Sequence, residues 1–150
     1  MAQTLISLYL HIVYSTKRRQ KLIRPELEDE LYKYMGGIYR RYDCKLILAN
    51  GMEDHTHNLV SLSKSIALKD LQREVKKSSS RWANTERPGK FRFRWQDGYA
   101  AFSVSPSNIE SVKRYIKNQK HHHKTMTFEK EFELLLEKHS VDYDPRYFLD

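Results

Sequence analysis

The sequence predicts an α+β fold, a mostly antiparallel β-sheet with helices packed on it, in the order βαββαββαα. Three observations support this prediction. The chain begins with a strand-like alternation, a turn joins two short strand-like stretches near its middle, and longer stretches carry apolar residues at helical spacing. We expect residues 1–150 to form one domain, because 150 residues suffice for a single core.

The first strand is expected over residues 4–15. Alternate positions are apolar, and His11 falls on the opposite, more polar face. A basic segment follows, whose Lys17, Arg18 and Arg19 could bind phosphates or could form an exposed turn. The apolar face of this strand would consist of Ile6, Leu8, Leu10, Ile12 and Tyr14.

A helix is expected to begin at Pro25. Proline suits the first turn of a helix, and the acidic residues just after it favour the positive end of the helix dipole. The pattern continues to Tyr42 despite Gly36 and Gly37. Its buried face would consist of Leu27, Leu31, Tyr34 and Ile38.

A β-hairpin is expected next, with strands over 43–50 and 55–62 joined through Asn50 and Gly51. On the second strand, His55, His57 and Leu59 share one face. Thr56, Asn58, Val60 and Leu62 share the other.

The histidine pair is the first candidate site. Residues two apart on a strand have Cα atoms about 7 Å apart, so both imidazoles of His55 and His57 could reach one metal ion. An isolated pair of this kind is more often two surface or hydrogen-bonded histidines. A third partner is needed before the pair indicates a site.

A second helix is expected over 67–82, with an apolar underside and a basic outer face that includes Arg73 and Lys77. Residues 91–96 then alternate aromatic and polar side chains, which predicts a strand with Arg92 and Arg94 on one side. Aromatic rings stack on unpaired bases and arginines hold phosphates, although core aromatics beside solvated arginines would give the same pattern. The returning strand would cover 99–104.

The next helix is expected over 109–119, because Ile109, Val112 and Ile116 form an apolar stripe. Tyr115 and Gln119 are four residues apart, so a phenol and an amide project together beside that stripe. Taken alone, they would be a boundary tyrosine and a solvated amide.

The end of the chain predicts a last amphipathic helix that packs on the body or on a partner subunit. Three consecutive histidines precede it, and because they cannot all face one site we expect them to be mainly solvated; the alternative is that one of them contacts metal or phosphate. The histidines are His121, His122 and His123, and the apolar stripe consists of Phe128, Phe132, Leu135, Leu136 and His139.

Composition limits the function classes. The net charge of +8 favours a polyanionic partner, but charge alone does not separate DNA, RNA, anionic lipid or a merely soluble surface. The single cysteine, Cys44, excludes an intrachain disulfide and a cysteine-based zinc site. No apolar run is long enough for a membrane span and no secretory pattern opens the chain, so we expect a cytoplasmic protein without a membrane partner.

Together, the His55-Thr56-His57 motif and a later helix bearing Tyr115 and Gln119 resemble the single-tyrosine HUH transposases. These are the small TnpA-type proteins that mobilise bacterial insertion sequences as single-stranded DNA. The resemblance covers nearly the whole chain. Further similar segments are Val13–Lys17, Trp95–Tyr99, Phe102–Ser105, Met126–Phe128 and Tyr143–Asp144.

The resemblance implies a ferredoxin-like (RRM-like) HUH fold and a DNA-cleaving and DNA-rejoining activity. Tyr115 would attack single-stranded DNA to give a 5′-phosphotyrosine and a free 3′-OH. His55, His57 and Gln119 would hold a divalent metal, Mg²⁺ in cells, although imidazole ligands suit Mn²⁺ better. The expected partners are hairpin ends of an insertion sequence and a second subunit, in a homodimer whose tyrosine helix acts in trans.

The chain departs from the family at two positions. The family usually has an aliphatic residue between the histidines and another just after them, where this chain has Thr56 and Asn58. Two other function classes therefore stay open. One is a domesticated, non-catalytic protein that binds single-stranded nucleic acid, and the other is a metal-dependent phosphodiesterase that uses water as its nucleophile.

Overall fold

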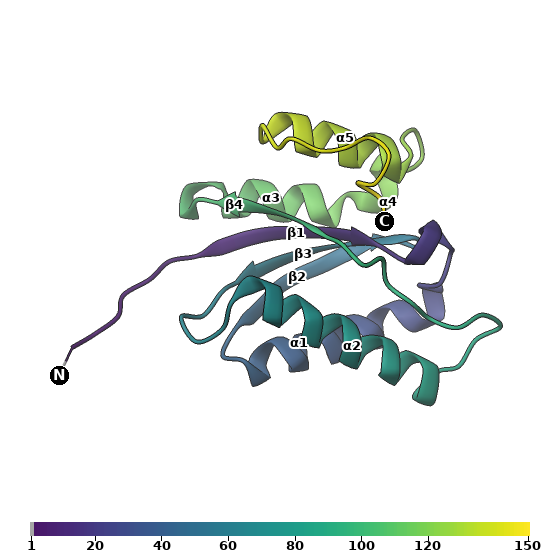
Figure 1. Cartoon of the computed structure of the whole chain (residues 1–150), viewed down its shortest axis with the longest axis horizontal. Coiled ribbons are helices and arrows are strands. Elements are labelled where there is room, and N and C mark those ends of the chain that lie inside the picture. Colours follow the sequence, from purple (N-terminus) through teal and green to yellow (C-terminus); the bar gives the residue numbers. More distant parts are fainter. Residues whose placement is uncertain (1) are drawn as a thin grey trace.

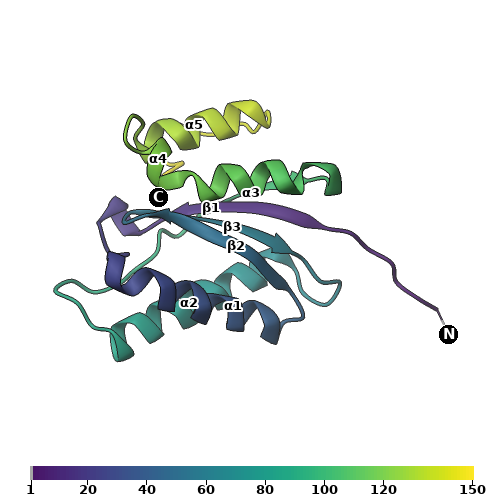
Figure 2. The same cartoon turned by 180° about the vertical axis from the view of Figure 1, so that it is seen from behind.

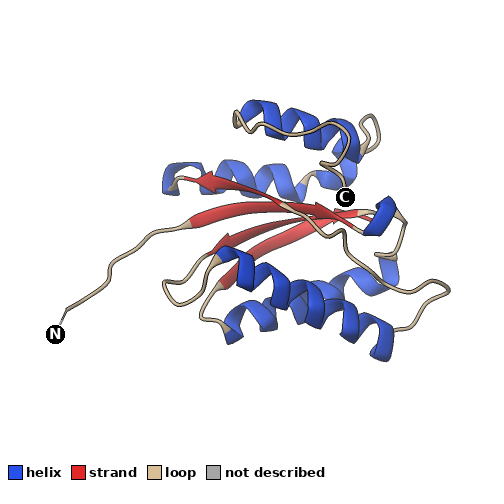
Figure 3. Ribbon diagram, viewed as in Figure 1, coloured by secondary structure: helices blue, strands red, loops and turns tan. Residues whose placement is uncertain are grey.

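The computed structural model describes residues 2–150. Four antiparallel strands form one sheet in the order β2-β3-β1-β4, with helices on both faces (Figures 1 and 3). The predicted α+β class is therefore confirmed. The strands are β1 Tyr9–Ser15, β2 Lys45–Met52, β3 His55–Ser61 and β4 Ala100–Val104. The helices are α1 Pro25–Arg41, α2 Leu68–Glu86, α3 Ile109–Lys117, α4 Gln119–His122 and α5 Phe128–Lys138, with short 3₁₀ turns at Lys17–Arg19 and Pro106–Asn108.

Strand register decides which side chains meet on each face. β1 lies between β3 and β4, and its Val13 is paired with His57 while Ile12 is paired with Asn58. Paired residues of antiparallel strands point to the same side, so His57 and Asn58 belong to opposite faces. The expected hairpin of β2 and β3 is also present, with Met52 opposite His55.

The helices cover the two faces unequally. α1 and α2 pack together below the sheet in Figure 1, and they bury the largest apolar cluster, which includes Leu31, Val75 and Ile12. α3 and α5 cover the other face, as the reverse view in Figure 2 also shows. Ile116 of α3 packs there on Leu59. Within residues 2–150, no helix is both long and apolar enough to cross a membrane.

α5 packs on the body of its own chain. This is one of the two expected arrangements, the other being packing on a partner subunit. Its apolar stripe, Phe128, Phe132, Leu135 and Leu136, lies in one buried cluster with Val13, Ala100 and Phe102 of the sheet.

The predicted strand over 91–96 is wrong. Trp95 makes a single bridge to Thr16, and the peptide groups of Phe93 are bound by the Asn84 side chain of α2 instead of by a neighbouring strand. This side-chain clamp holds the segment across α2, with Phe93 and Trp95 buried and Phe91 61% exposed. The order is consequently β1-α1-β2-β3-α2-β4-α3-α4-α5, one strand fewer and one short helix more than predicted.

The first strand is also shorter than predicted, because it begins at Tyr9 and not at residue 4. Its neighbours end where it begins, since Tyr9 pairs with Ser61 of β3 and Val104 of β4. Residues 2–8 extend away from the body (Figure 1), and Leu5 is 84% exposed.

Candidate active site

The two histidines of β3 form the floor of the site. His55 and His57 are fully buried on the face covered by α3 and α5, with ring centroids 5.1 Å apart. Their Nε2 atoms lie 3.4 Å and 3.0 Å from Oε1 of Glu131. The predicted shared face is therefore confirmed, and both imidazoles point at one carboxylate.

The opposite ring nitrogens are occupied, which fixes both rings. Nδ1 of His55 lies 2.8 Å from Oδ1 of Asp54, and Nδ1 of His57 lies 2.8 Å from Nε2 of His11 on β1. The His11 ring also stacks on His57 at 5.0 Å between centroids. Metal-binding histidines are typically held by such a second hydrogen bond.

Tyr115 and Gln119 reach the same cluster from two helices. The single helix expected over 109–119 is wrong at its end, because Asn118 leaves the helical conformation and Gln119 begins α4. Gln119 is fully buried, with Oε1 2.9 Å from Nε2 of His55 and its amide donating to Oε2 of Glu131 at 2.7 Å. The half-buried Tyr115 donates its hydroxyl to the same Oε2 atom. The structure thus brings together His55, His57, Tyr115 and Gln119, all from one chain.

The tyrosine helix is held on the sheet by polar contacts as well as by Ile116. The Asn50 side chain donates to the carbonyl of Ile116 at 2.9 Å, and Lys120 donates to the carbonyl of Gly51 at 2.6 Å. These contacts join the end of α3 and the start of α4 to the β2–β3 hairpin. They explain how Tyr115 reaches the histidines of its own chain.

Glu131 is the central residue that the sequence analysis missed. It is 2% exposed on α5, and Oε1 also lies 2.9 Å from Nε2 of His123. A sequence signal existed, because Glu131 stands three residues after Phe128 and four before Leu135, within the apolar stripe of the helix. The prediction of mainly solvated histidines is wrong for His123, whose side chain is 6% exposed.

The cluster concentrates charge in a buried place. Burial alone would raise the pKa of Glu131, but hydrogen bonds from His123, His55 and His57 hold it far below its usual range. Burial alone would lower the pKa of His55, but its bonds to Asp54 and Glu131 raise it to about 9. Burial lowers the pKa of His57. Near neutral pH, an ionised carboxylate therefore faces a protonated His55 and a neutral His57.

Tyr115 keeps its proton under these conditions. Burial and the negative charge of Glu131 both raise the pKa of its phenol. The phenol is thus a hydrogen-bond donor to Glu131 in the resting site.

The donor set fits a divalent cation. One nitrogen from each of His55 and His57 and one oxygen from Glu131 lie within 4.8 Å of one another, all buried. The amide oxygen of Gln119 is adjacent to them. Imidazole nitrogens with carboxylate and amide oxygens suit ions such as Mn²⁺ and, with waters, Mg²⁺. This buried cluster could bind a metal.

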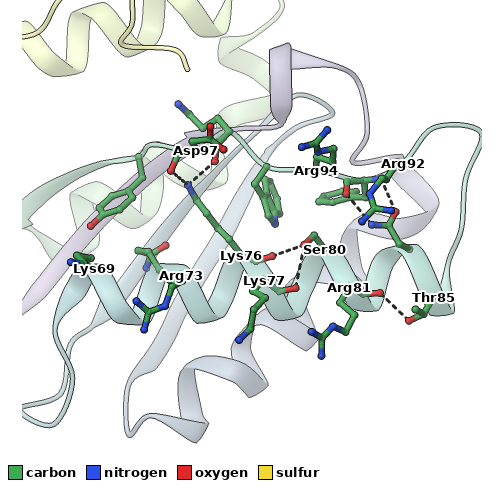
Figure 4. A pocket seen from close by; sticks show the side chains of 16 residues that line it. Lys69, Arg73, Lys76, Lys77, Ser80, Arg81, Thr85, Arg92, Arg94 and Asp97 are labelled. Carbon is green, nitrogen blue, oxygen red and sulfur yellow. Dashed lines mark hydrogen bonds between the residues drawn. The ribbon is translucent and has the colours of Figure 1, made fainter.

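A basic groove of about 750 Å³ lies on the other side of the molecule, between α2 and the segment 92–99 (Figure 4). Four of the predicted DNA-binding residues line it: Arg73, Lys77, Arg92 and Arg94. Lys76 joins its two walls, because its ammonium donates to the carbonyls of Gln96 and Gly98 at 2.9 Å and 2.6 Å.

The other three predicted DNA-binding residues do not line this groove. Lys17 forms an ion pair with Asp97 at 3.1 Å, and Arg19 forms one with Glu129 at 2.8 Å. Arg18 is exposed between them. The basic 3₁₀ turn therefore lies outside the groove but beside it, because Lys17 contacts two residues that line it, Asp97 through its side chain and Arg94 through a backbone hydrogen bond.

Comparisons with known proteins identify the family of the chain. ISDra2 transposase TnpA from Deinococcus radiodurans is 24% identical over 117 residues, which cover 73% of this chain and 81% of that protein. A D. radiodurans crystal structure described as a transposase matches with a TM-score of 0.60 and 22% identity, over 79% of this chain and 95% of that one. A REP-associated tyrosine transposase bound to a REP hairpin matches with a TM-score of 0.55 and 12% identity, over 79% of this chain and 68% of that one. The model of the family described as "Transposase IS200 like" matches residues 4–119, and the chain therefore belongs to the IS200-like transposases.

Proposed function

We propose that this chain cleaves and rejoins single-stranded DNA at insertion-sequence ends through a covalent link to Tyr115. The observation that carries the proposal is the phenol of Tyr115, held by Glu131 beside the buried histidine pair of an IS200-like transposase. The phenolic oxygen would attack a backbone phosphorus and form a P–O bond. The P–O3′ bond would break, leaving a 3′-OH and a 5′-phosphotyrosine.

The reaction is balanced without an external energy source. The phenol loses its proton and the departing 3′ oxygen gains one, while the phosphodiester bond energy is conserved in the phosphotyrosine. Attack by a 3′-OH on the phosphotyrosine would then release Tyr115 and rejoin the strand. No nucleotide cofactor is needed.

We propose that His55, His57 and Gln119, together with Glu131, hold a divalent metal. The ion is expected to be Mg²⁺ in cells, with Mn²⁺ an effective substitute. When bound, it would neutralise charge on the phosphate oxygens. Asp54 and His11 would keep the two imidazoles in a fixed orientation, as their hydrogen bonds do here.

We further propose that the basic groove binds DNA phosphates through Arg73, Lys77, Arg92 and Arg94. The groove is lined mainly from one helix and one adjoining segment, and the side chains of Arg73 and Lys77 project from α2 (Figure 4). The relative bound to a hairpin suggests a hairpin as the ligand. Loss of one phosphate contact should weaken binding and reduce the salt dependence by about one unit of slope. Titrations of R94Q with a labelled hairpin at several salt concentrations would test this role.

Lys17, Arg18 and Arg19 are proposed as a second DNA contact, beside the groove. Their turn connects β1, which carries His11, with α1. The ion pairs of Lys17 and Arg19 are partly exposed, so phosphates could compete for these side chains. An R18Q variant should then bind single strands more weakly, in the same titration.

The resemblance also implies a cytoplasmic homodimer in which the tyrosine helix serves the other subunit. The contacts within this chain instead favour action in cis, since Tyr115 meets its own Glu131. Mixing Y115F with H57Q distinguishes the two arrangements. Recovery of covalent product requires action in trans, and no recovery indicates action in cis. Light scattering would measure the assembly.

The covalent link is the decisive observable. Purified protein is incubated with single-stranded hairpin oligonucleotides from its own genomic flanks and Mg²⁺ or Mn²⁺, and protein–DNA adducts are separated on a denaturing gel. We expect an adduct that Y115F and a chelator abolish. Tyr147 is 60% exposed, so Y147F serves as the matched control and should leave the adduct unchanged.

The same gel separates the other two function classes. Binding without any adduct would replace the proposal with a non-catalytic nucleic-acid-binding protein. Cleavage that persists in Y115F would identify a phosphodiesterase that uses water.

A further inference from the structure

The segment after residue 119 lies outside the family match, which covers residues 4–119. This segment nevertheless supplies Glu131, the carboxylate that joins the histidines and the tyrosine of the site. Glu131 on α5 faces both the histidine pair and the tyrosine, and it is 2% exposed.

The two oxygens of Glu131 face different groups. Oε1 lies 3.0 Å from Nε2 of His57 and 2.9 Å from Nε2 of His123. Oε2 accepts hydrogen bonds from the Tyr115 hydroxyl and from the Gln119 amide, the latter at 2.7 Å. One carboxylate therefore connects the histidine side of the site with the tyrosine side.

The packing and capping of α5 hold this carboxylate in place. Phe128, one turn before Glu131, stacks on the His55 ring at 4.3 Å between centroids. Phe132, the next residue, lies in the buried cluster with Val13 of β1. The Thr127 side chain caps the helix by accepting from the Lys130 backbone N–H. Glu131 is thus fixed from both sides along the helix.

We propose that Glu131 is a positioning residue for the nucleophile: it holds the Tyr115 hydroxyl at a defined place beside the histidine pair. The inference rests on the proposed transposase function for its kinetic consequence only. Without the carboxylate, the phenol would lose the hydrogen bond that fixes the place of its hydroxyl. A misplacement of about 1 Å is enough to slow an enzymatic step about 100-fold.

The test compares E131Q with E133Q. Glu133 lies on the same helix, is partly exposed and has only a 4.0 Å ion pair with Lys130, so E133Q controls for the loss of one charge on α5. At saturating oligonucleotide and saturating Mn²⁺, so that metal occupancy does not limit the rate, we expect E131Q to form adduct about 100-fold more slowly. Its affinity for the oligonucleotide should stay within about threefold of the parent protein, because Glu131 is buried away from the basic groove. A rate within about twofold of E133Q would overturn the proposal.

A second measurement does not depend on activity. The chain is prepared with 3-fluorotyrosine at position 115 only, and its ¹⁹F resonance is recorded without DNA. We expect E131Q to move this resonance and E133Q to leave it in place. An unmoved resonance in E131Q would overturn the proposed link even if the rate fell.

The two measurements separate failure of this inference from failure of the proposed function. If the parent protein forms no adduct with any oligonucleotide, the transposase chemistry fails while the resonance still decides the Glu131–Tyr115 link. Should E131Q not fold, E131D keeps the charge that the histidines face but shortens the side chain. The proposal then expects E131D to show the same displaced resonance and the same loss of rate.

Discussion

Both faces of β3 carry buried polar side chains, but the two faces differ in how these side chains are hydrogen-bonded. His55 and His57 point towards α5, and Thr56 and Asn58 point towards α1 and α2; all four side chains are fully buried. A strand with polar residues on both faces is unusual inside a protein, because each buried polar group needs a partner. The two faces satisfy this requirement in different ways.

The face towards α1 and α2 uses neutral groups only. Asn58 donates to the Tyr39 hydroxyl at 3.0 Å and accepts from Thr56 at 3.0 Å. Gln72 of α2 donates to the same Tyr39 oxygen at 3.2 Å. Burial raises the pKa of Tyr39 to about 12, so this network stays uncharged at ordinary pH.

The histidine face instead gathers ionisable groups around one carboxylate. Three imidazoles and a phenol contact Glu131, and a proton on His55 balances its charge. A cation can replace such a proton, whereas a neutral network has no charge to exchange. Burial of polar residues therefore does not by itself indicate a functional site. An ionised carboxylate that is surrounded by several hydrogen-bond donors, as Glu131 is, does indicate one.

Removing a histidine should affect activity far more than folding. In H57Q an amide fills similar space, but the imidazole nitrogen that faces Glu131 is lost. We expect adduct formation to slow about 1,000-fold, equivalent to ~4 kcal/mol of transition-state stabilisation. Single-turnover gel assays measure the rate, and urea unfolding measures stability. A comparable loss of folding free energy would mean that the two faces do not differ in role.

The sequence predicted the parts of this comparison that depend on local periodicity. The alternation along β3 placed His55 and His57 together, and helical spacing placed Tyr115 beside Gln119. The apolar stripe of α5 indicates that Glu131 is buried, but its contact with His57, 74 residues away in sequence, follows from no local pattern. His11 was placed on the polar face of its strand, but its contact with His57 depends on strand register, which that alternation does not define.

The failed strand has a different cause. The aromatic and basic alternation over 91–96 is typical of a strand, but Asn84 binds the peptide N–H and carbonyl of Phe93 at 2.7 Å and 3.0 Å. A side chain from another element thus replaces the neighbouring strand. Such tertiary overrides of local propensity cannot be read from the segment itself.

On the neutral face, the expected loss is in stability. N58A removes the donor to Tyr39 and the acceptor of Thr56, and it leaves a cavity in the main core. We expect a loss of about 2–3 kcal/mol in the free energy of unfolding, measured with urea. The adduct rate per folded molecule should stay within about twofold of the parent protein, since Asn58 touches no group of the histidine cluster. A rate loss like that of H57Q would show that the faces are coupled.

The pH dependence should distinguish the faces in the metal-free protein. The pKa of His55 is raised to about 9 in the folded state, so the stability it contributes is present below pH 6.5 and lost as pH rises through 9. Between these limits we expect urea unfolding in a chelator to show a loss on the order of 1–3 kcal/mol.

Two controls accompany the pH series. Mn²⁺ should abolish the decline, because a bound cation takes the place of the proton. N58A should keep the slope of the parent protein, since the neutral network does not titrate in this range. A flat profile in the metal-free parent protein would contradict a protonated His55.

The smallest effect is expected at Thr56, where the family usually has an aliphatic residue. T56V keeps the shape but removes the hydroxyl that donates to Asn58 Oδ1, so one buried acceptor loses its donor. We expect a cost of about 1 kcal/mol in urea unfolding and no change in adduct rate.

A double-variant comparison tests whether Thr56 and Asn58 act together. The T56V/N58L double variant should lose less free energy of unfolding than the T56V and N58L single variants lose in sum, because it removes both partners of the hydrogen bond together. Simple additivity would mean that the threonine and asparagine act independently. A non-additive pair would show that these two departures from the family compensate each other within the neutral network, away from the chemistry on the other face.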